Sequence, residues 1–327
     1  MIINRNRIIS DMLQSYNNDE ILRLRLFVRF EGEDAEDLSG VTKDLFSSFW
    51  REVKKMYMKG DRCFNFLISP ENILNESELI SFGRILLHGY KLTGFLPTFI
   101  NQAQLYLITT KNNPSEGLLT DSFLSTLSHQ DSALLSGALE KDFFDDQLKG
   151  KIMDIMSSYE IRGLPRPSNL KNLLTNVARY ELLVKPYFYL EKMARRISNW
   201  DENSFLKILD TLKPNGRRVA ECLINTDRFD PHVERVFDYL KRFVAGLDQQ
   251  QVEVFLRFVT GLEVFTEEVS IVVQFNGVTD PERMAPQANT CGNVLTLSKY
   301  FFTYDHLKET LWAIINNPEF WNSFSVI

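Results

Sequence analysis

Hydrophobic positions in the last third of the chain recur at helical spacing in three segments. The first, residues 232–246, carries apolar side chains at i, i+4, i+7 and i+8, namely Val236, Leu240, Phe243 and Val244. The second, residues 248–261, opens on a capping-box pair of Asp248 and Gln251 and closes at Gly261. The third begins at Thr303 and presents one apolar face, made of Leu307, Leu311, Ile314 and Ile315. These patterns predict three amphipathic helices.

Two short apolar runs between the second and third helices have the character of strands. Residues 271–275 read Ile-Val-Val-Gln-Phe, and residues 294–297 read Val-Leu-Thr-Leu. Gly277 and Pro281 mark the loop that follows the first run. The C-terminal part of the chain is therefore predicted to mix helices with a small sheet.

The first two hundred residues are mostly helical in pattern. A strand and an acidic turn are expected in residues 24–34. A helix is expected in residues 41–57, where one face repeats Val41, Leu45, Phe49, Val53 and Met56. Residues 78–92 predict another helix, and residues 123–160 an irregular helical stretch. The longest helical pattern, residues 172–197, contains Pro186, which should end or kink it.

The breaks in these patterns predict two lobes of an α+β protein. The chain has 327 residues, more than one hydrophobic core usually serves. Residues 111–122 are rich in turn formers, Pro165 and Pro167 mark a second break, and residues 225–232 are polar. We expect a large, mostly helical N-terminal lobe over residues 1–224, a hinge at 225–230, and a small mixed lobe over 231–327.

Charge and composition exclude several classes of protein. The net charge is −6, and no Lys/Arg cluster is interleaved with aromatic residues, which argues against a nucleic-acid-binding protein. No apolar run approaches the roughly 20 residues that a membrane-spanning helix needs. The first residues do not have the pattern of a signal peptide. An intracellular protein, cytoplasmic or nuclear, without membrane partners is expected.

Cysteine and histidine usage predicts no metal site. The three cysteines, Cys63, Cys222 and Cys291, are far apart and form no CxxC motif, so neither a disulfide framework nor a zinc site fits. The four histidines form no HExxH pair.

Three stretches, in order, resemble the HECT family of ubiquitin ligases. They are FVRFEGEDAEDLSGVTKDLF (27–46), FLRFVTG (255–261) and MAPQANTCGNVLTL (284–297). The family pattern for the third is LPxAHTCFNxL, which this chain matches at Pro286, Ala288, Thr290, Cys291, Asn293 and Leu295. It departs from the family His at Asn289 and from the family Phe at Gly292, and Ala285 replaces a Leu.

The resemblance implies a bilobal HECT-like fold and a ubiquitin-protein transferase with Cys291 as its nucleophile. Ubiquitin would pass from a conjugating enzyme to Cys291 as a thioester, and then to a lysine of a protein substrate. A thiol suits this exchange because a few per cent of it is thiolate at neutral pH, and the chemistry that the resemblance implies needs no cofactor. Thr290 and Asn293 are expected to support the cysteine loop. Phe324, at the position of a family Phe, is expected to order the tail beside the cysteine.

The resemblance also implies a conjugating-enzyme site on a subdomain at residues 115–165. No family contact motif aligns there. Phe143 and Phe144, an aromatic pair among acidic residues, are candidate anchors, because aromatic side chains carry much of the binding energy at interfaces. The alternative is that one or both belong to the core.

Other interpretations remain open at this point. Cys63 and Cys222 are read as structural. A catalytically degenerate HECT-like interaction module would keep the fold without the activity. A cysteine hydrolase would need a histidine such as His306 brought to Cys291. Transfer from a charged conjugating enzyme distinguishes the three classes.

Overall fold

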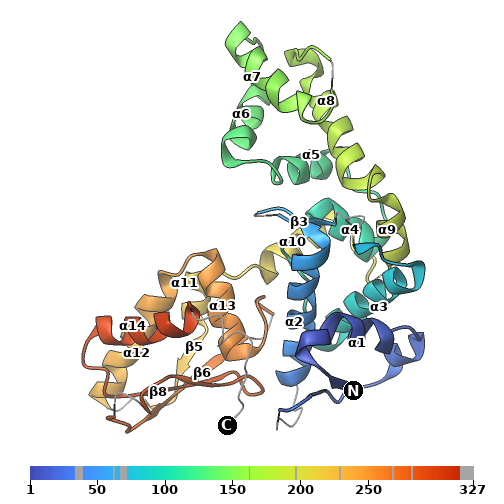
Figure 1. The fold of residues 1–327 in the computed structure, drawn as a ribbon. Helices are drawn as coiled ribbons and strands as arrows, with labels where there is room; N and C mark the ends of the chain where they lie inside the picture. The colour runs from blue at the N-terminus through green and yellow to red at the C-terminus, as the bar shows by residue number, and fades with distance from the viewer. Residues whose placement is uncertain are drawn as a thin grey trace. The chain divides into compact units, whose positions relative to one another are not determined.

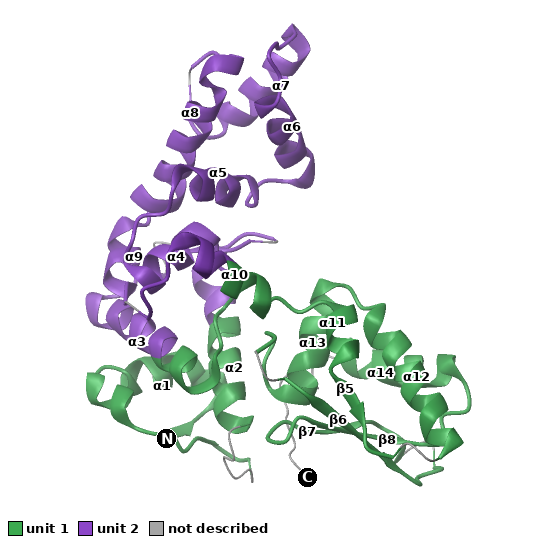
Figure 2. Ribbon diagram, turned by 180° about the vertical axis from the view of Figure 1, so that it is seen from behind, with its two compact units in different colours: residues 1–52, 88–97, 207–327 green, residues 53–87, 98–206 purple. Residues whose placement is uncertain are grey.

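The computed structural model describes residues 1–33, 40–61, 63–66, 72–161, 163–195, 197–227, 230–266, 269–280 and 283–316. Figure 1 shows the helices and strands of the fold, and Figure 2 shows the two compact units into which the described residues divide. Unit 1 comprises Met1–Glu52, His88–Pro97 and Lys207–Ile327, and unit 2 comprises Val53–Leu87 and Thr98–Leu206.

Unit 2 is built mainly of helices. Its helices are α4 (Gln102–Thr110), α5 (Glu116–Leu124), α6 (His129–Leu139), α7 (Asp146–Ser157), α8 (Pro167–Arg179), η4 (Tyr180–Val184) and α9 (Tyr187–Met193). A short hairpin, β3 (Met58–Lys59) with β4 (Asn65–Phe66), accompanies them. Ser115, Ser128 and Asp145 each accept a hydrogen bond from a backbone N–H in the first turn of the next helix. The turn-rich break expected at 111–122 is therefore shorter, because Ser115 starts α5.

The long helix predicted around Pro186 is interrupted there, as expected. α8 ends at Arg179, and η4 is a single π-helical turn in which the Lys185 N–H donates to the Tyr180 carbonyl at 2.9 Å. Proline has no N–H and its ring crowds the preceding turn, so the wider π-turn accommodates it. α9 resumes directly after Pro186.

Three helices contribute residues to both units: α2 (Gly40–Tyr57), α3 (Glu76–Thr93) and α10 (Glu202–Leu212). α2 confirms the helix predicted over 41–57. Its expected apolar positions are buried except Met56, which is 48% exposed. α3 confirms the helix predicted over 78–92 and extends it by two residues at the start and one at the end.

The N-terminal segment of unit 1 contains one unforeseen strand. β1 (Ile2–Ile3) pairs in parallel with β2 (Arg29–Phe30). β2 is shorter than the strand expected in residues 24–34. Between them lie η1 (Arg5–Arg7), α1 (Ile8–Ser15) and η2 (Asp19–Arg23).

The C-terminal part of unit 1 is a four-stranded mixed sheet with helices. Its strands are β5 (Leu223–Asn225), β6 (Ile271–Asn276), β7 (Gln287–Asn289) and β8 (Val294–Ser298), in the order β5-β6-β8-β7. β6 is parallel to β5 and β8, and β7 is antiparallel to β8. The helices are α11 (Gly216–Glu221), α12 (Pro231–Ala245), α13 (Gln249–Thr260) and α14 (Tyr304–Ile315). The predicted strands β6 and β8 and the predicted helices α12, α13 and α14 are confirmed, as is the α+β class.

One hydrophobic core joins these helices to the sheet. It includes Val236, Leu240 and Phe243 from α12, and Leu307 and Leu311 from α14, all at most 3% exposed. Burying one such side chain fully contributes about 1.5–3 kcal/mol. The apolar faces read from the sequence are therefore the faces that stabilise this part of the fold.

Residues just before the predicted hinge at 225–230 are part of the C-terminal sheet. Residues 223–225 form β5, which pairs with β6 inside the C-terminal sheet, and Asn225 is buried. Val219 and Leu223 belong to the same core as α12. Gly216 lies against the Val244 carbonyl so closely that a β-carbon there would be 2.4 Å from it. Residues 216–225 thus pack with the C-terminal core, and the hinge at 225–230 stays a prediction.

Candidate active site

Cys291 lies in a hairpin loop between two strands of the C-terminal sheet. β7 and β8 are antiparallel, with Asn289 opposite Val294, so residues 290–293 form the connection. Cys291 is partly buried and Gly292 is exposed. The sulfur therefore belongs to a surface loop and not to the core.

The side chain of Asn289 shapes this loop. Its Oδ1 atom accepts hydrogen bonds from the backbone N–H of Cys291 at 3.1 Å and of Gly292 at 3.2 Å. An Asn side chain that accepts from the backbone two residues ahead folds the chain into a tight turn. The residue that replaces the family His therefore has a structural role of its own.

Thr290 and Asn293, the predicted supporting residues, flank Cys291. Thr290 is only 9% exposed. Asn293 has a φ of 51°, in the left-handed region that Asn adopts more readily than most residues. Its carbonyl accepts a hydrogen bond from the Val272 N–H at 3.0 Å, which ties the loop to β6.

The Cys291 loop packs against the first turn of α2. A β-carbon built on Gly40 would lie 2.8 Å from the Cys291 sulfur, 2.5 Å from Thr290 Oγ1 and 2.9 Å from the Cys291 nitrogen. Only glycine allows so close an approach. Burial lowers the pKa of the nearby Lys43 ammonium, and the charge of an ionised Cys291 partly offsets that shift.

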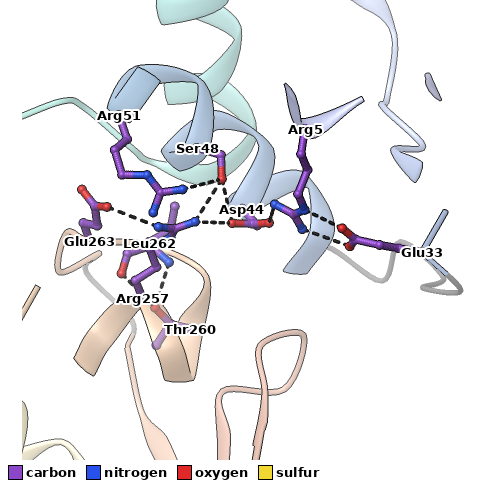
Figure 3. A network of polar contacts seen from close by, with 9 residues as sticks. All are labelled: Arg5, Glu33, Asp44, Ser48, Arg51, Arg257, Thr260, Leu262 and Glu263. Carbon is purple, nitrogen blue, oxygen red and sulfur yellow. Dashed lines mark hydrogen bonds and ion pairs between the residues drawn. The ribbon is translucent and has the colours of Figure 1, made fainter. Parts of the chain in front are cut away.

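A buried ionic network joins α2 to α13 in the same unit (Figure 3). Arg257 Nη2 donates to Asp44 Oδ1 at 3.0 Å and to Ser48 Oγ at 3.0 Å. Asp44 Oδ2 lies 2.8 Å from Arg5 Nη1, and Arg5 also pairs with Glu33. The side chains of Arg257 and Asp44 are 5% and 6% exposed.

Asp44 is held in its charged form inside this network. Burial opposes the charge, but the guanidinium groups of Arg257 and Arg5 outweigh burial and keep the pKa of Asp44 below its usual value. A carboxylate between two guanidiniums thus links the N-terminal segment, α2 and α13.

The structure separates the two predicted anchor residues of unit 2. Phe143 is 74% exposed, whereas Phe144 is 1% exposed. The Lys149 ammonium lies 5.9 Å from the centre of the Phe143 ring. Phe144 is therefore a core residue and cannot contact a partner in this fold, while Phe143 remains accessible.

The other candidate residues have local structural contacts. Burial raises the pKa of the Cys222 thiol, with a smaller opposing effect from Arg218, and this residue packs on the C-terminal core. The His306 N–H donates to Thr303 Oγ1 at the start of α14, and its ring packs edge-on against Phe301. Phe324 lies outside the described residues.

Within the described ranges, no three His, Cys, Asp or Glu side chains gather in a way that could hold a metal ion. The same part of the chain contains no helix that is long and apolar enough to span a membrane.

Two features were not predicted from the sequence: the closeness of Gly40 and Lys43 to Cys291, and the buried ion pair of Asp44 and Arg257. Two signals were present. Arg257 interrupts the apolar run Phe255-Leu256-Arg257-Phe258-Val259, and a buried charge requires a partner. Gly40 stands at the start of α2, where close approach by another segment is possible.

Comparison with known families agrees with this geometry. Residues 211–323 match the family model described as HECT-domain (ubiquitin-transferase). The match begins just before α11, earlier than the predicted lobe boundary, and it covers the sheet and the Cys291 loop. The helical N-terminal part and the mixed C-terminal sheet are consistent with the α+β HECT fold. Residues 211–323 of this chain are therefore similar to a HECT domain.

Proposed function

We propose that this protein is a ubiquitin-protein transferase that carries ubiquitin as a thioester on Cys291. The observation that carries the proposal is the position of Cys291. It is partly buried in a surface hairpin loop of the region that matches the HECT-domain model. Cys63 lies outside the matched region, and Cys222 packs on the core within it.

The chemistry consists of two acyl transfers. The Cys291 thiolate attacks the carbonyl carbon that joins ubiquitin to the conjugating-enzyme cysteine. The carbon–sulfur bond to that enzyme breaks, its thiolate leaves, and a new thioester forms on Cys291. A substrate lysine amine then attacks the same carbonyl carbon and loses a proton, an amide bond forms, and the Cys291 thiolate is released. Neither step requires an oxidant or a reductant.

The residues around Cys291 support the reaction by holding the loop. Asn289 fixes the backbone at Cys291 and Gly292 through its two hydrogen bonds. Asn293 adopts the left-handed conformation that returns the chain into β8. A preformed loop presents the sulfur without an ordering cost at each encounter. In the family pattern, a His stands at the position of Asn289 and a Phe at that of Gly292, whereas Asn293 matches. Neither replacement removes the thiol of Cys291.

We further propose that unit 2 binds the conjugating enzyme through Phe143. The support is its 74% exposure, since an exposed aromatic side chain suits an interface anchor. Phe324 is proposed, from the resemblance alone, to assist transfer from Cys291 to lysine. The proposed acceptor of ubiquitin is a lysine of a protein substrate. The proposed location of the protein is the cytoplasm or the nucleus.

The test is transfer from a conjugating enzyme already charged with ubiquitin, read on reducing and non-reducing gels. Wild-type protein should gain one ubiquitin in a form that reductant removes. Cys291→Ala should gain none, while Cys63→Ala and Cys222→Ala should behave as wild type. A folded wild-type protein that accepts no ubiquitin from any of several conjugating enzymes would instead indicate a degenerate interaction module.

A further inference from the structure

We infer that Asp44 and Arg257 form a latch that holds the Cys291 loop against the first turn of α2, so that the thiol becomes fully accessible only when this ion pair separates. The importance of that access for ubiquitin transfer rests on the proposed function. The accessibility of the sulfur itself does not depend on it.

The first support is the closeness of the packing at Cys291. The position of a β-carbon on Gly40 is 2.8 Å from the sulfur and 2.9 Å from the Cys291 nitrogen. Both are shorter than ordinary van der Waals contact. The backbone of α2 therefore occupies one side of the thiol, and a reagent cannot approach from that side while the loop is docked.

A second glycine, at the end of α13, allows that helix to lie close to the start of α2. Gly261 has a φ of 80°, and a β-carbon on it would lie 3.3 Å from the Gly40 carbonyl oxygen and 3.4 Å from Lys43 Cβ. The loop after α13 and the Cys291 loop thus both contact the start of α2. Two separate segments of the C-terminal sheet region share one docking surface.

The third support is the ion pair itself, which lies one turn along α2 from Gly40. Arg257 belongs to α13, and Asp44 belongs to α2. The pair is held by a hydrogen bond of 3.0 Å, with Ser48 as a second acceptor for the same Arg257 nitrogen. Both side chains are nearly excluded from solvent. Removing one partner leaves the other charge buried without its principal counter-charge, which favours separation of the two segments.

Arg5 and Glu33 extend the latch to the N-terminal segment. Arg5 pairs with the second oxygen of Asp44, and its other donors are taken by Glu33. Asp44 therefore lies between the guanidinium groups of Arg5 and Arg257. Removing its charge would weaken its contacts with both the N-terminal segment and α13. Arg257 also approaches Glu263 at 3.9 Å, a looser contact.

The latch is tested by the rate at which iodoacetamide alkylates Cys291, followed by intact mass in a Cys63→Ser, Cys222→Ser background. Asp44→Asn keeps the shape of the side chain and removes its charge. Alkylation should become about tenfold faster, which corresponds to about 1.4 kcal/mol in the docking equilibrium. Asp238→Asn, an exposed aspartate on α12, is the matched control and should leave the rate unchanged.

Gly40→Ala tests the same docking by crowding instead of charge. Its methyl group would overlap the Cys291 loop, so alkylation should again accelerate. Gly277→Ala is the control, because no atom lies within 4 Å of a β-carbon there. Thermal unfolding checks that each variant is folded.

Acceleration in both Asp44→Asn and Gly40→Ala supports the latch. An unchanged rate in folded Gly40→Ala overturns the docking, and an unchanged rate in folded Asp44→Asn overturns the role of the ion pair. Because alkylation uses no ubiquitin, these results stand apart from the ubiquitin-loading test. A latch that behaves as described in a protein that accepts no ubiquitin would refute only the proposed function.

Discussion

Asn289 Oδ1 accepts a hydrogen bond from the Cys291 backbone N–H at 3.1 Å, so the residue two positions before the cysteine directly sets its backbone. The same oxygen accepts from Gly292 at 3.2 Å. The loop therefore keeps a defined turn although it lacks the His and Phe of the HECT pattern. Gly292 alone would leave the backbone free, and Asn289 restricts it.

Asn289→Ala should slow ubiquitin loading onto Cys291. The two lost hydrogen bonds contribute roughly 1 kcal/mol each to the stability of the loop, so a decrease of up to about thirtyfold is expected. The rate is measured in a single-turnover transfer from charged conjugating enzyme. Asn289→Asp retains the acceptor oxygen and should load at close to the wild-type rate. Equal loading by Asn289→Ala and wild type would show that the turn does not need this side chain.

Phe143→Ala should weaken loading by the conjugating enzyme without destabilising the protein. An exposed anchor contributes to binding, and its truncation typically costs about 2 kcal/mol or more of binding free energy. The measurement is the dependence of the loading rate on conjugating-enzyme concentration, together with the melting temperature.

Phe144→Ala is the matched comparison, because the neighbouring ring is buried. Truncating a buried Phe costs about 3–5 kcal/mol of unfolding free energy, so the melting temperature should fall clearly. If Phe143→Ala loads normally at every concentration, the conjugating enzyme docks elsewhere.

The stability of unit 1 should fall in mildly acidic solution because of His88. Its Nδ1 lies 2.9 Å from the Tyr16 hydroxyl oxygen, and the side chain is 1% exposed. Burial lowers the pKa of His88, a backbone contact with Leu24 partly offsets this, and Lys91 lowers it further. Below the ordinary histidine pKa of about 6.5, the unfolded chain binds a proton that the folded chain resists, so the unfolding free energy decreases with falling pH.

The slope from this one group is at most about 1.4 kcal/mol per pH unit, between about pH 6.5 and the lowered folded value. Denaturant titrations from pH 7.5 down to pH 5 measure it. His88→Gln keeps a polar partner for Tyr16 and removes the titration, so its stability should depend less on pH over this range. Identical pH profiles for the two proteins would exclude His88 as the cause.

Phe324→Ala should retain ubiquitin loading on Cys291 and slow the transfer to lysine. The expectation follows from the resemblance, in which this Phe acts after loading. The two steps are measured separately, first with charged conjugating enzyme and then by discharge of the loaded protein to free lysine. Equal loss of both steps would assign the residue to folding or docking instead.

The sequence was sufficient where local periodicity determines the fold. The apolar faces of α12 and α14 are set by spacing within one helix, so they were predicted residue by residue. β7 was missed, because Gln287-Ala288-Asn289 has no strand pattern and becomes a strand through its pairing with β8. β5 was missed because it is only three residues long and its last residue, Asn225, begins the polar stretch 225–232.

In the candidate site, too, residues close together in the sequence were predicted, and contacts between distant residues were not. Thr290, Cys291 and Asn293 are neighbours in sequence and were predicted together. Asp44 and Arg257 are 213 residues apart, and only the fold brings them within 3.0 Å. No periodicity links two such positions, so a contact between distant charges could be found only in the structure.

The central claim, that Cys291 carries ubiquitin, is tested most directly by comparing wild type with Cys291→Ser in one single-turnover transfer. Wild type should form an adduct that reductant removes. Serine should form a slower oxyester that survives reductant and maps to residue 291 by peptide mass spectrometry. An adduct that maps to Cys63, Cys222 or a lysine, or one that forms equally well and stays reductant-sensitive in Cys291→Ser, would contradict the assignment.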